Sequence, residues 1–367
     1  MNGFAKTQAP DVEVAATPAP APADDLSLRL LCRLAAAAAL IAAVFSLTAC
    51  GGGGGGAPEP PPAPPPPTPA PAPTAPIAAQ LSVPTPVGYD ADRLAAFNRL
   101  NEIRLSAGLG MLAQSTAMDR AAQAHADWMI ANDSFTHDEM AGTSGFTGTN
   151  WARRDEAFGY VPVGGGEVMS SGATPGPGVD LLVNAVYHRA FLLAIEPVDV
   201  GVGWSDSAVE TLSKPLVIDL TRPSSDALRG LGQMAQDSIQ GVAIWPLNDA
   251  RDVPLRLGLE SPNPVPTQDV LSLGTPVSIT VDRMKTITAS RFVLTNRQTG
   301  AVVATQALTY QSDPNGVVTG SYVAAIPLSA LAPAATYDVA FSGTTLEFPS
   351  GVVATVDRAW SFTTAAQ

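Results

Sequence analysis

Three histidines are the residues of this chain best suited to acid–base or metal chemistry, and the 367-residue sequence contains no others. One of them, His137, stands in the stretch DSFTHDE, between an aromatic residue and two acids. An imidazole transfers protons or binds a cation only when other polar groups converge on it. Imidazole and carboxylate together suit zinc or a similar cation, because both donate at about 2.0–2.2 Å. His137 is therefore a candidate site residue whose partners must come from elsewhere in the chain.

His125 has a different pattern around it. It falls at helical spacing with Met118, Ala122 and Met129, so that the four side chains share one face of a helix. Because its neighbours on that face are apolar, we expect His125 to be buried and structural rather than a ligand. The sequence contains no His-Glu-x-x-His pair and no Gly-x-Ser-x-Gly segment, so no motif independently indicates hydrolysis.

Helical patterns precede strand patterns in the first half of the globular sequence, which favours an α+β sandwich over a parallel sheet. Asp90 can cap a first helix that stops at Gly108, and Ser115 or Thr116 can cap a second. The remaining elements expected here are a third helix over 179–194 and two strands, paired antiparallel, at 200–204 and 216–220.

Six segments in this part of the chain resemble, in order, those of bacterial CAP-superfamily domains, also called SCP or PR-1-like domains. They are LNEIRLSAGLGML, AAQAHADWM, FTHDE, GGGEVMSSG, YHRAFLLAIEPVDVGVG and VAIWPLNDARDVP, and the resemblance runs from about Tyr89 to Pro264. It implies a three-layer α-β-α sandwich. It also implies a cleft that is lined, in many members, by two histidines and two acids able to hold a divalent metal ion.

By this resemblance His137 matches the first histidine, Glu167 the glutamate after the glycines, and His188 the second histidine. Ala185 stands where many members carry the second acid, so the resemblance implies at most a weakly bound cation such as zinc. A hydrogen-bonded structural cluster of the same side chains is the alternative. The acids that could substitute are Asp138, Glu139 and Asp180; the aromatic residues expected in the core are Phe135, Tyr187 and Phe191; and Met140 and Trp151 could line the cleft or pack in loops.

The C-terminal part has a different periodicity. After the proline-rich joint at 260–266, short alternating runs separated by turn signals predict a β-sandwich. This part resembles bacterial Ig-like domains through segments such as GTPVSITV and WSFTT, and we expect it to fold independently. The strands are expected at 277–281, 292–295, 302–308, 321–326, 337–341 and 360–363.

The N-terminal region has the pattern of a lipoprotein signal. Arg29 and Arg33 precede a short apolar run, which ends in Leu-Thr-Ala-Cys50 and resembles a bacterial lipobox. We therefore expect lipidation of Cys50, and a short membrane anchor is the alternative. Gly51 offers no acidic retention signal, which favours the outer membrane. A linker rich in Gly and Pro follows and favours an extended polyproline II spacer.

Composition limits the function further. The formal net charge of −13 leaves no basic patch for nucleic acid, and both cysteines lie within the first fifty residues, so the globular part can form no disulfide. The sequence thus predicts a lipid-anchored, non-catalytic envelope protein whose CAP cleft binds a small apolar ligand or a protein partner. The alternatives are a metal-assisted hydrolase with Glu167 as general base, or a structural adhesin. The expected domains are a signal region (1–50), a linker (51–83), a CAP domain (84–264) and an Ig-like sandwich (265–367).

Overall fold

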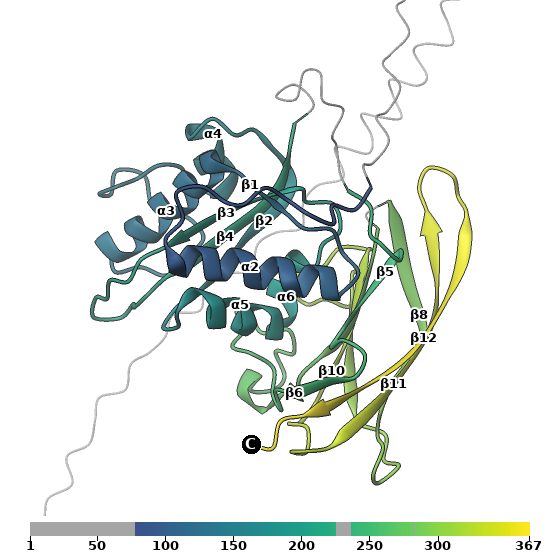
Figure 1. Cartoon of the computed structure of the whole chain (residues 1–367). Coiled ribbons are helices and arrows are strands. Elements are labelled where there is room, and N and C mark those ends of the chain that lie inside the picture. Colours follow the sequence, from purple (N-terminus) through teal and green to yellow (C-terminus); the bar gives the residue numbers. More distant parts are fainter. Residues whose placement is uncertain (1–77, 225–235, 283) are drawn as a thin grey trace, which may run out of the picture. The chain divides into compact units, whose positions relative to one another are not determined.

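The computed structural model describes residues 78–224, 236–282 and 284–367 (Figure 1). Cys50, the signal region and most of the linker lie outside the described residues. Within the described ranges, no helix has the length and hydropathy needed to span a bilayer.

The first part of the chain is built on a four-stranded sheet with the order β1-β3-β4-β2. Strand β4 pairs antiparallel with both β2 and β3, whereas β1 pairs parallel with β3. The antiparallel pairing expected for the two predicted strands is therefore confirmed. The bounds are β1 (Ala113–Gln114), β2 (Pro162–Ser170), β3 (Asp199–Trp204) and β4 (Leu216–Pro223).

Helices cover both faces of this sheet, with α3 and α4 on one side and α2, α5 and α6 on the other (Figure 1). The predicted caps are present: Asp90 accepts a hydrogen bond at the start of α2, and Ser115 does so at the start of α3. The bounds are α2 (Ala91–Ser106), α3 (Thr116–Ala131), α4 (Trp151–Ala157), α5 (Pro175–Asn184) and α6 (Val186–Leu192).

The single helix expected over 179–194 was wrong in one respect, because the chain forms two helices there. Ala185 has an extended conformation (φ −87°, ψ 129°), so it ends α5 and begins α6. Burial explains why the periodicity did not reveal this break. Residues on both sides of Ala185 are apolar and buried, so the hydrophobic pattern runs on through the change of direction.

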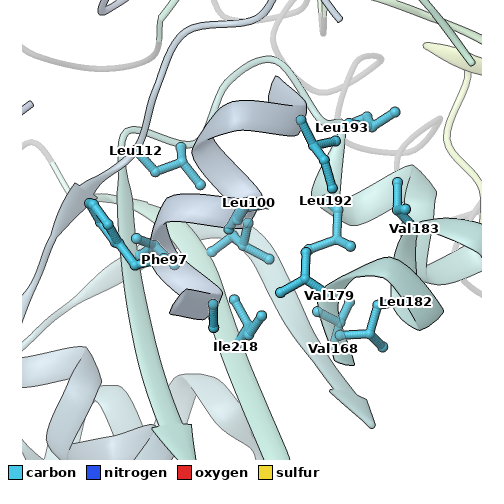
Figure 2. Close-up of a cluster of buried hydrophobic side chains, with 14 of the residues drawn as sticks. Phe97, Leu100, Leu112, Val168, Val179, Leu182, Val183, Leu192, Leu193 and Ile218 are labelled. Atoms are coloured by element: carbon cyan, nitrogen blue, oxygen red, sulfur yellow. The ribbon is translucent and has the colours of Figure 1, made fainter. Parts of the chain in front are cut away.

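The main core of this part lies between the sheet and the helices α2, α5 and α6. Figure 2 shows Phe97 and Leu100 of α2 gathered with Val179 and Leu182 of α5 over Ile218 of the sheet. All five side chains are at most 3% exposed. Phe97 and Leu100 therefore fix α2 against the sheet.

On the opposite face, α3 lies unusually close to β3 because two glycines of that strand leave room for it. A Cβ atom added to Gly201 would lie 2.4 Å from the backbone carbon of Met118, and one added to Gly203 would lie 2.2 Å from that of Ala122. Backbone atoms cannot yield as a flexible side chain would, so any side chain here must push the helix away from the sheet.

The C-terminal part consists of two four-stranded sheets with the orders β5-β7-β10-β9 and β6-β12-β11-β8. One hydrophobic cluster contains residues of both sheets, including Ile279, Val323, Phe341 and Trp360, so the sheets pack face to face. The bounds are β5 (Val242–Trp245), β6 (Ala250–Val253), η1 (Val270–Ser272), β7 (Val277–Val281), β8 (Lys285–Asn296), β9 (Thr305–Thr309), β10 (Tyr322–Pro327), β11 (Thr336–Glu347) and β12 (Val353–Thr364).

The strand pairing does not follow the domain boundary expected after residue 264. Strands β5 and β6 lie before that boundary, yet β5 pairs with β7 and β6 pairs with β12. Each is an edge strand, and the hydrophobic pattern of a short edge strand does not show which sheet it will join. A separate apolar cluster contains Val186 and Tyr187 of α6 together with Leu308 and Tyr322, so the described residues share contacts across the joint.

The packing of α3 gives a direct test by mutation. We expect Gly203→Ala to lower the free energy of unfolding by about 3 kcal/mol, because the added methyl group overlaps backbone atoms of α3. Gly176→Ala in α5 is the matched control, since its methyl group would meet only the Ala95 side chain at 3.7 Å. Urea unfolding followed by circular dichroism measures both variants, and equal stability of the two would contradict this account.

Candidate functional site

His137 and Glu167 form a pair that joins a loop to the sheet. His137 lies in the loop between α3 and α4, and its Nδ1 is 2.8 Å from Oε1 of Glu167 on β2. The imidazole side chain is 53% exposed, whereas the glutamate side chain is fully buried. A buried carboxylate therefore orients an imidazole that remains accessible to other molecules.

Arg154 on α4 is the cation that stabilises this pair from beneath. Its fully buried guanidinium places Nη2 at 2.5 Å from Oε2 of Glu167, and Nη1 donates to the backbone oxygen of His137. Burial by itself would raise the pKa of Glu167, but the hydrogen bond from His137 and the charge of Arg154 lower it. Glu167 is therefore held as a carboxylate, and both of its oxygens are engaged.

His125 is buried on α3, where it packs parallel to the Trp128 ring. Its environment is nevertheless not wholly apolar, because Nδ1 lies 3.0 Å from Oε1 of Glu139 and Nε2 lies 3.0 Å from the backbone oxygen of Thr136. Each ring nitrogen thus has a polar partner. His125 also comes within 3.9 Å of Glu167. His125 thus belongs to the same buried polar cluster as Glu139 and Glu167. The apolar residues at helical spacing around it did not indicate this role.

Two further carboxyl groups lie beside Glu167 with incomplete compensation. Asp219 on β4 stands directly opposite Glu167 in the strand register, and Asp155 follows Arg154 on α4. Both are 0% exposed, and the charge of Arg154 offsets only part of the cost of their burial. Burial, together with the charge of Glu167, raises the pKa of Asp155 to about 7 and that of Asp219 well above its usual value.

His188 on α6 has an acidic partner that sequence reasoning did not identify. Its Nδ1 lies 2.6 Å from Oε1 of Glu260, which follows β6 in the joint between the two parts of the chain. Oε2 of the same carboxylate accepts a hydrogen bond from the backbone N–H of Tyr187 at 2.8 Å. No sequence spacing relates residues so far apart, and Glu260 precedes a serine and a proline as an ordinary turn residue would.

The two histidine–glutamate pairs face two adjoining cavities that have His137, His188, Ser261 and Pro262 in common. One cavity, of about 300 Å³, also contacts both glutamates. The other, of about 470 Å³, has a mainly apolar wall. The apolar residues lining this larger cavity are Phe135, Met169, Leu181, Leu182, Ala185, Leu259 and Pro262.

The structure thus brings His137, Glu167 and His188 to one cavity, together with Trp151. The prediction that Phe135 lies in the core was wrong, because this residue is half exposed and lines the larger cavity. Tyr187 is buried, as expected of a core residue, and both Tyr187 and Phe191 also contact the smaller cavity. Among the remaining candidates, Asp138 lines the smaller cavity and Ala185 lines the larger one. Glu139, Met140 and Asp180 line neither cavity.

The donor set does not fit a metal ion. Within residues 78–224, 236–282 and 284–367, no group of three or more His, Cys, Asp or Glu side chains is arranged to hold one. Both oxygens of Glu167 are already engaged by Arg154 and His137, so this carboxylate is not free to bind a cation.

Comparison with known proteins finds a family-model match in the first part of the chain. Residues 97–209 match the model of the CAP family, the cysteine-rich secretory protein family. One similar solved structure is an extracellular protein with a SCP domain from Bacillus anthracis, at 22% identity over 36% of this chain and 40% of that chain (TM-score 0.31). Another is an outer surface protein from Borrelia burgdorferi, at 17% identity over 34% and 89% of the two chains (TM-score 0.30).

A search of curated proteins finds no match. The chain spans 40% of the length of the Bacillus protein. The residues that match the CAP family model include His137, Glu167 and His188. Glu260 lies beyond the match.

The raised pKa values of the buried Asp155 and Asp219 carboxyl groups predict that the stability of the protein depends on pH. An unfolded aspartate loses its proton near pH 3.9, whereas Asp155 in the folded protein keeps it to about pH 7. Folding therefore becomes less favourable as the pH rises from about 4 to about 7, and stays so above that range. We expect Asp155→Asn to be more stable than wild type by on the order of 2 kcal/mol at pH 8, and equally stable at pH 4.

Asp357→Asn, at an exposed position on β12, is the control and should leave the stability curve unchanged. Chemical denaturation at a series of pH values gives the two differences. A constant difference between Asp155→Asn and wild type at all pH values would show that Asp155 is ionised throughout and that this interpretation is wrong.

Proposed function

We propose that this protein is a lipid-anchored, non-catalytic protein of the bacterial cell envelope whose CAP domain binds a small, mainly apolar molecule. The larger cavity carries the proposal. Its lining leaves Leu181 51% exposed and Leu259 79% exposed, so apolar surface that a ligand could cover is in contact with water. Removing such surface from water stabilises a complex by about 25 cal/mol per Å².

The polar end of the same space gives the ligand an orientation. His137 and His188 border both cavities, and each has a buried glutamate behind it. A mainly apolar wall with a few fixed polar groups is the usual composition of a small-molecule site. The expected ligand therefore has an apolar body and a single polar group directed at the histidines. A protein partner is the other outcome that binding experiments can reveal.

The proposed protein also has a C-terminal module, a lipid anchor and a spacer. The C-terminal sheets pack face to face around one core, which supports an Ig-like module that follows the CAP domain in the chain. The lipobox-like segment ending at Cys50 supports the anchor, and the Gly/Pro-rich linker supports a spacer. An outer-membrane location is the expectation for such a lipoprotein without an acidic residue after the cysteine.

Ligand binding can be tested with the neutral apolar dye N-phenylnaphthylamine. We expect saturable fluorescence enhancement with wild type, and a loss of about tenfold in affinity for the double variant Leu181→Gln, Leu259→Gln, because apolar contact area is replaced by amides. Val302→Gln is the control, since Val302 is 67% exposed and lines neither cavity. Equal affinity of all three proteins would place the dye elsewhere and contradict the proposal. Mass spectrometry of solvent extracts then identifies the natural ligand.

The anchor has an independent test. We expect a fatty-acid probe fed to cells to label wild type and not Cys50→Ala, because diacylation requires the cysteine thiol. Labelling of both proteins to the same extent would remove the lipoprotein proposal without affecting the cavity.

A further inference from the structure

The segment before Glu260 lies along the break between α5 and α6. The backbone N–H of Gly258 donates to the oxygen of Asn184, and the Asn184 amide donates to the oxygen of Arg256. The fit is close, because a Cβ atom on Gly258 would lie 3.1 Å from the nitrogen of Ala185. Ala185 is itself only 1% exposed. The absence of a side chain at position 258 is thus what allows this segment to approach the backbone at the break.

This segment delivers Glu260 to His188. The glutamate side chain is fully buried, and it is held in place from the other side by the backbone N–H of Tyr187. At 2.6 Å, Nδ1 of His188 must carry a proton, because a bare nitrogen lone pair would be repelled by the carboxylate. The alignment is short of an ideal hydrogen bond, yet the charge fixes which ring nitrogen is protonated.

We propose that Glu260 is a positioning residue of the cavity. It replaces the acid missing at position 185, and it holds His188 with Nδ1 protonated and Nε2 toward the cavity. The proposal rests on the proposed ligand-binding function and names the chemical class of the ligand. It goes beyond the residues of the family match, because Glu260 belongs to the joint that leads to the C-terminal sheets.

The consequence for the ligand follows from the state of both imidazoles. His137 donates through Nδ1 to Glu167, whereas Nδ1 of His188 lies 2.6 Å from Oε1 of Glu260 without hydrogen-bond geometry, and no partner for either Nε2 is found in the described part of the chain. A neutral imidazole with a proton on Nδ1 has an acceptor at Nε2. When both imidazoles are neutral, the cavity therefore presents two acceptors beside an apolar wall. It selects an apolar molecule that carries a hydrogen-bond donor, such as a hydroxyl or an amine.

Glu260→Gln tests this with little change in shape. The amide oxygen accepts from Tyr187, which turns the amide NH₂ toward His188. A donor at that position requires an acceptor at Nδ1, so the proton moves to Nε2. We expect His188 to change from the Nδ1-H to the Nε2-H tautomer, and the cavity to present a donor in place of an acceptor. Glu260→Ala, with no group at that position, should give a mixture of both tautomers.

The first measurement is ring-nitrogen NMR at a pH of about 8.5, where free imidazole is neutral. The chain has only three histidines, so single His→Gln variants assign every signal. The expected result is a tautomer change confined to His188 in Glu260→Gln. An unchanged Nδ1-H tautomer at His188 in both Glu260 variants overturns the positioning role. A general structural role would alter thermal stability, but it would not exchange the proton between the two ring nitrogens.

The second measurement compares decanol with decyl methyl ether, which differ in the hydrogen-bond donor. Both compete with N-phenylnaphthylamine for wild type and Glu260→Gln at the same pH. We expect wild type to bind decanol roughly fivefold more tightly than the ether, and the variant to lose or reverse this preference. Equal binding of alcohol and ether by wild type overturns the ligand class. Failure of the dye to bind wild type overturns the proposed function instead, and the NMR result still decides the role of Glu260.

Discussion

The buried guanidinium of Arg154 is the interaction on which the site depends. It binds Glu167 of the sheet and the backbone of His137, so one side chain fixes both the carboxylate and the loop that carries the imidazole. It is also the main positive charge near four buried acids, the others being Glu139, Asp155 and Asp219. Removing it would leave uncompensated charge in the interior, which costs more than the ion pair contributes when complete.

This cluster also explains why the cavity histidines are held rather than free. A carboxylate in the interior is stable only with polar groups around it. Each cavity glutamate has a histidine Nδ1 within 2.8 Å and a hydrogen bond from one further group, Arg154 for Glu167 and the backbone N–H of Tyr187 for Glu260. The two histidines thus share a buried acid as neighbour, although His137 is the more exposed and its glutamate comes from a strand rather than from the joint.

The joint itself has a larger role than that of a spacer. Contacts between the first part of the chain and the C-terminal sheets are made by β5, β6, the segment at 256–260 and the cluster around Tyr187. The contact between Glu260 and His188, for which we propose a positioning role, adds to these structural contacts. A pattern of prolines indicates where regular elements stop, but it carries no information about which buried group the extended chain reaches.

Much of the architecture could be predicted from sequence because it rests on local chemistry. The caps at Asp90 and Ser115 depend on residues within one turn of a helix, and both are present. The alternating residues at 277–281 form strand β7 as predicted, although all five are buried. His137, Glu167 and His188 could be nominated by resemblance, and the structure brings them to one cavity.

The break at Ala185 and the partner of His188 were decided only by the tertiary structure. The first depends on how two apolar helices fit the same sheet, and the second on a contact between residues more than seventy positions apart. The same holds for the charged surroundings of His125, whose neighbours along the helix are apolar. Residue types and local spacing determine which elements form. The identity of a buried charge's partner depends on chain segments that meet only after folding.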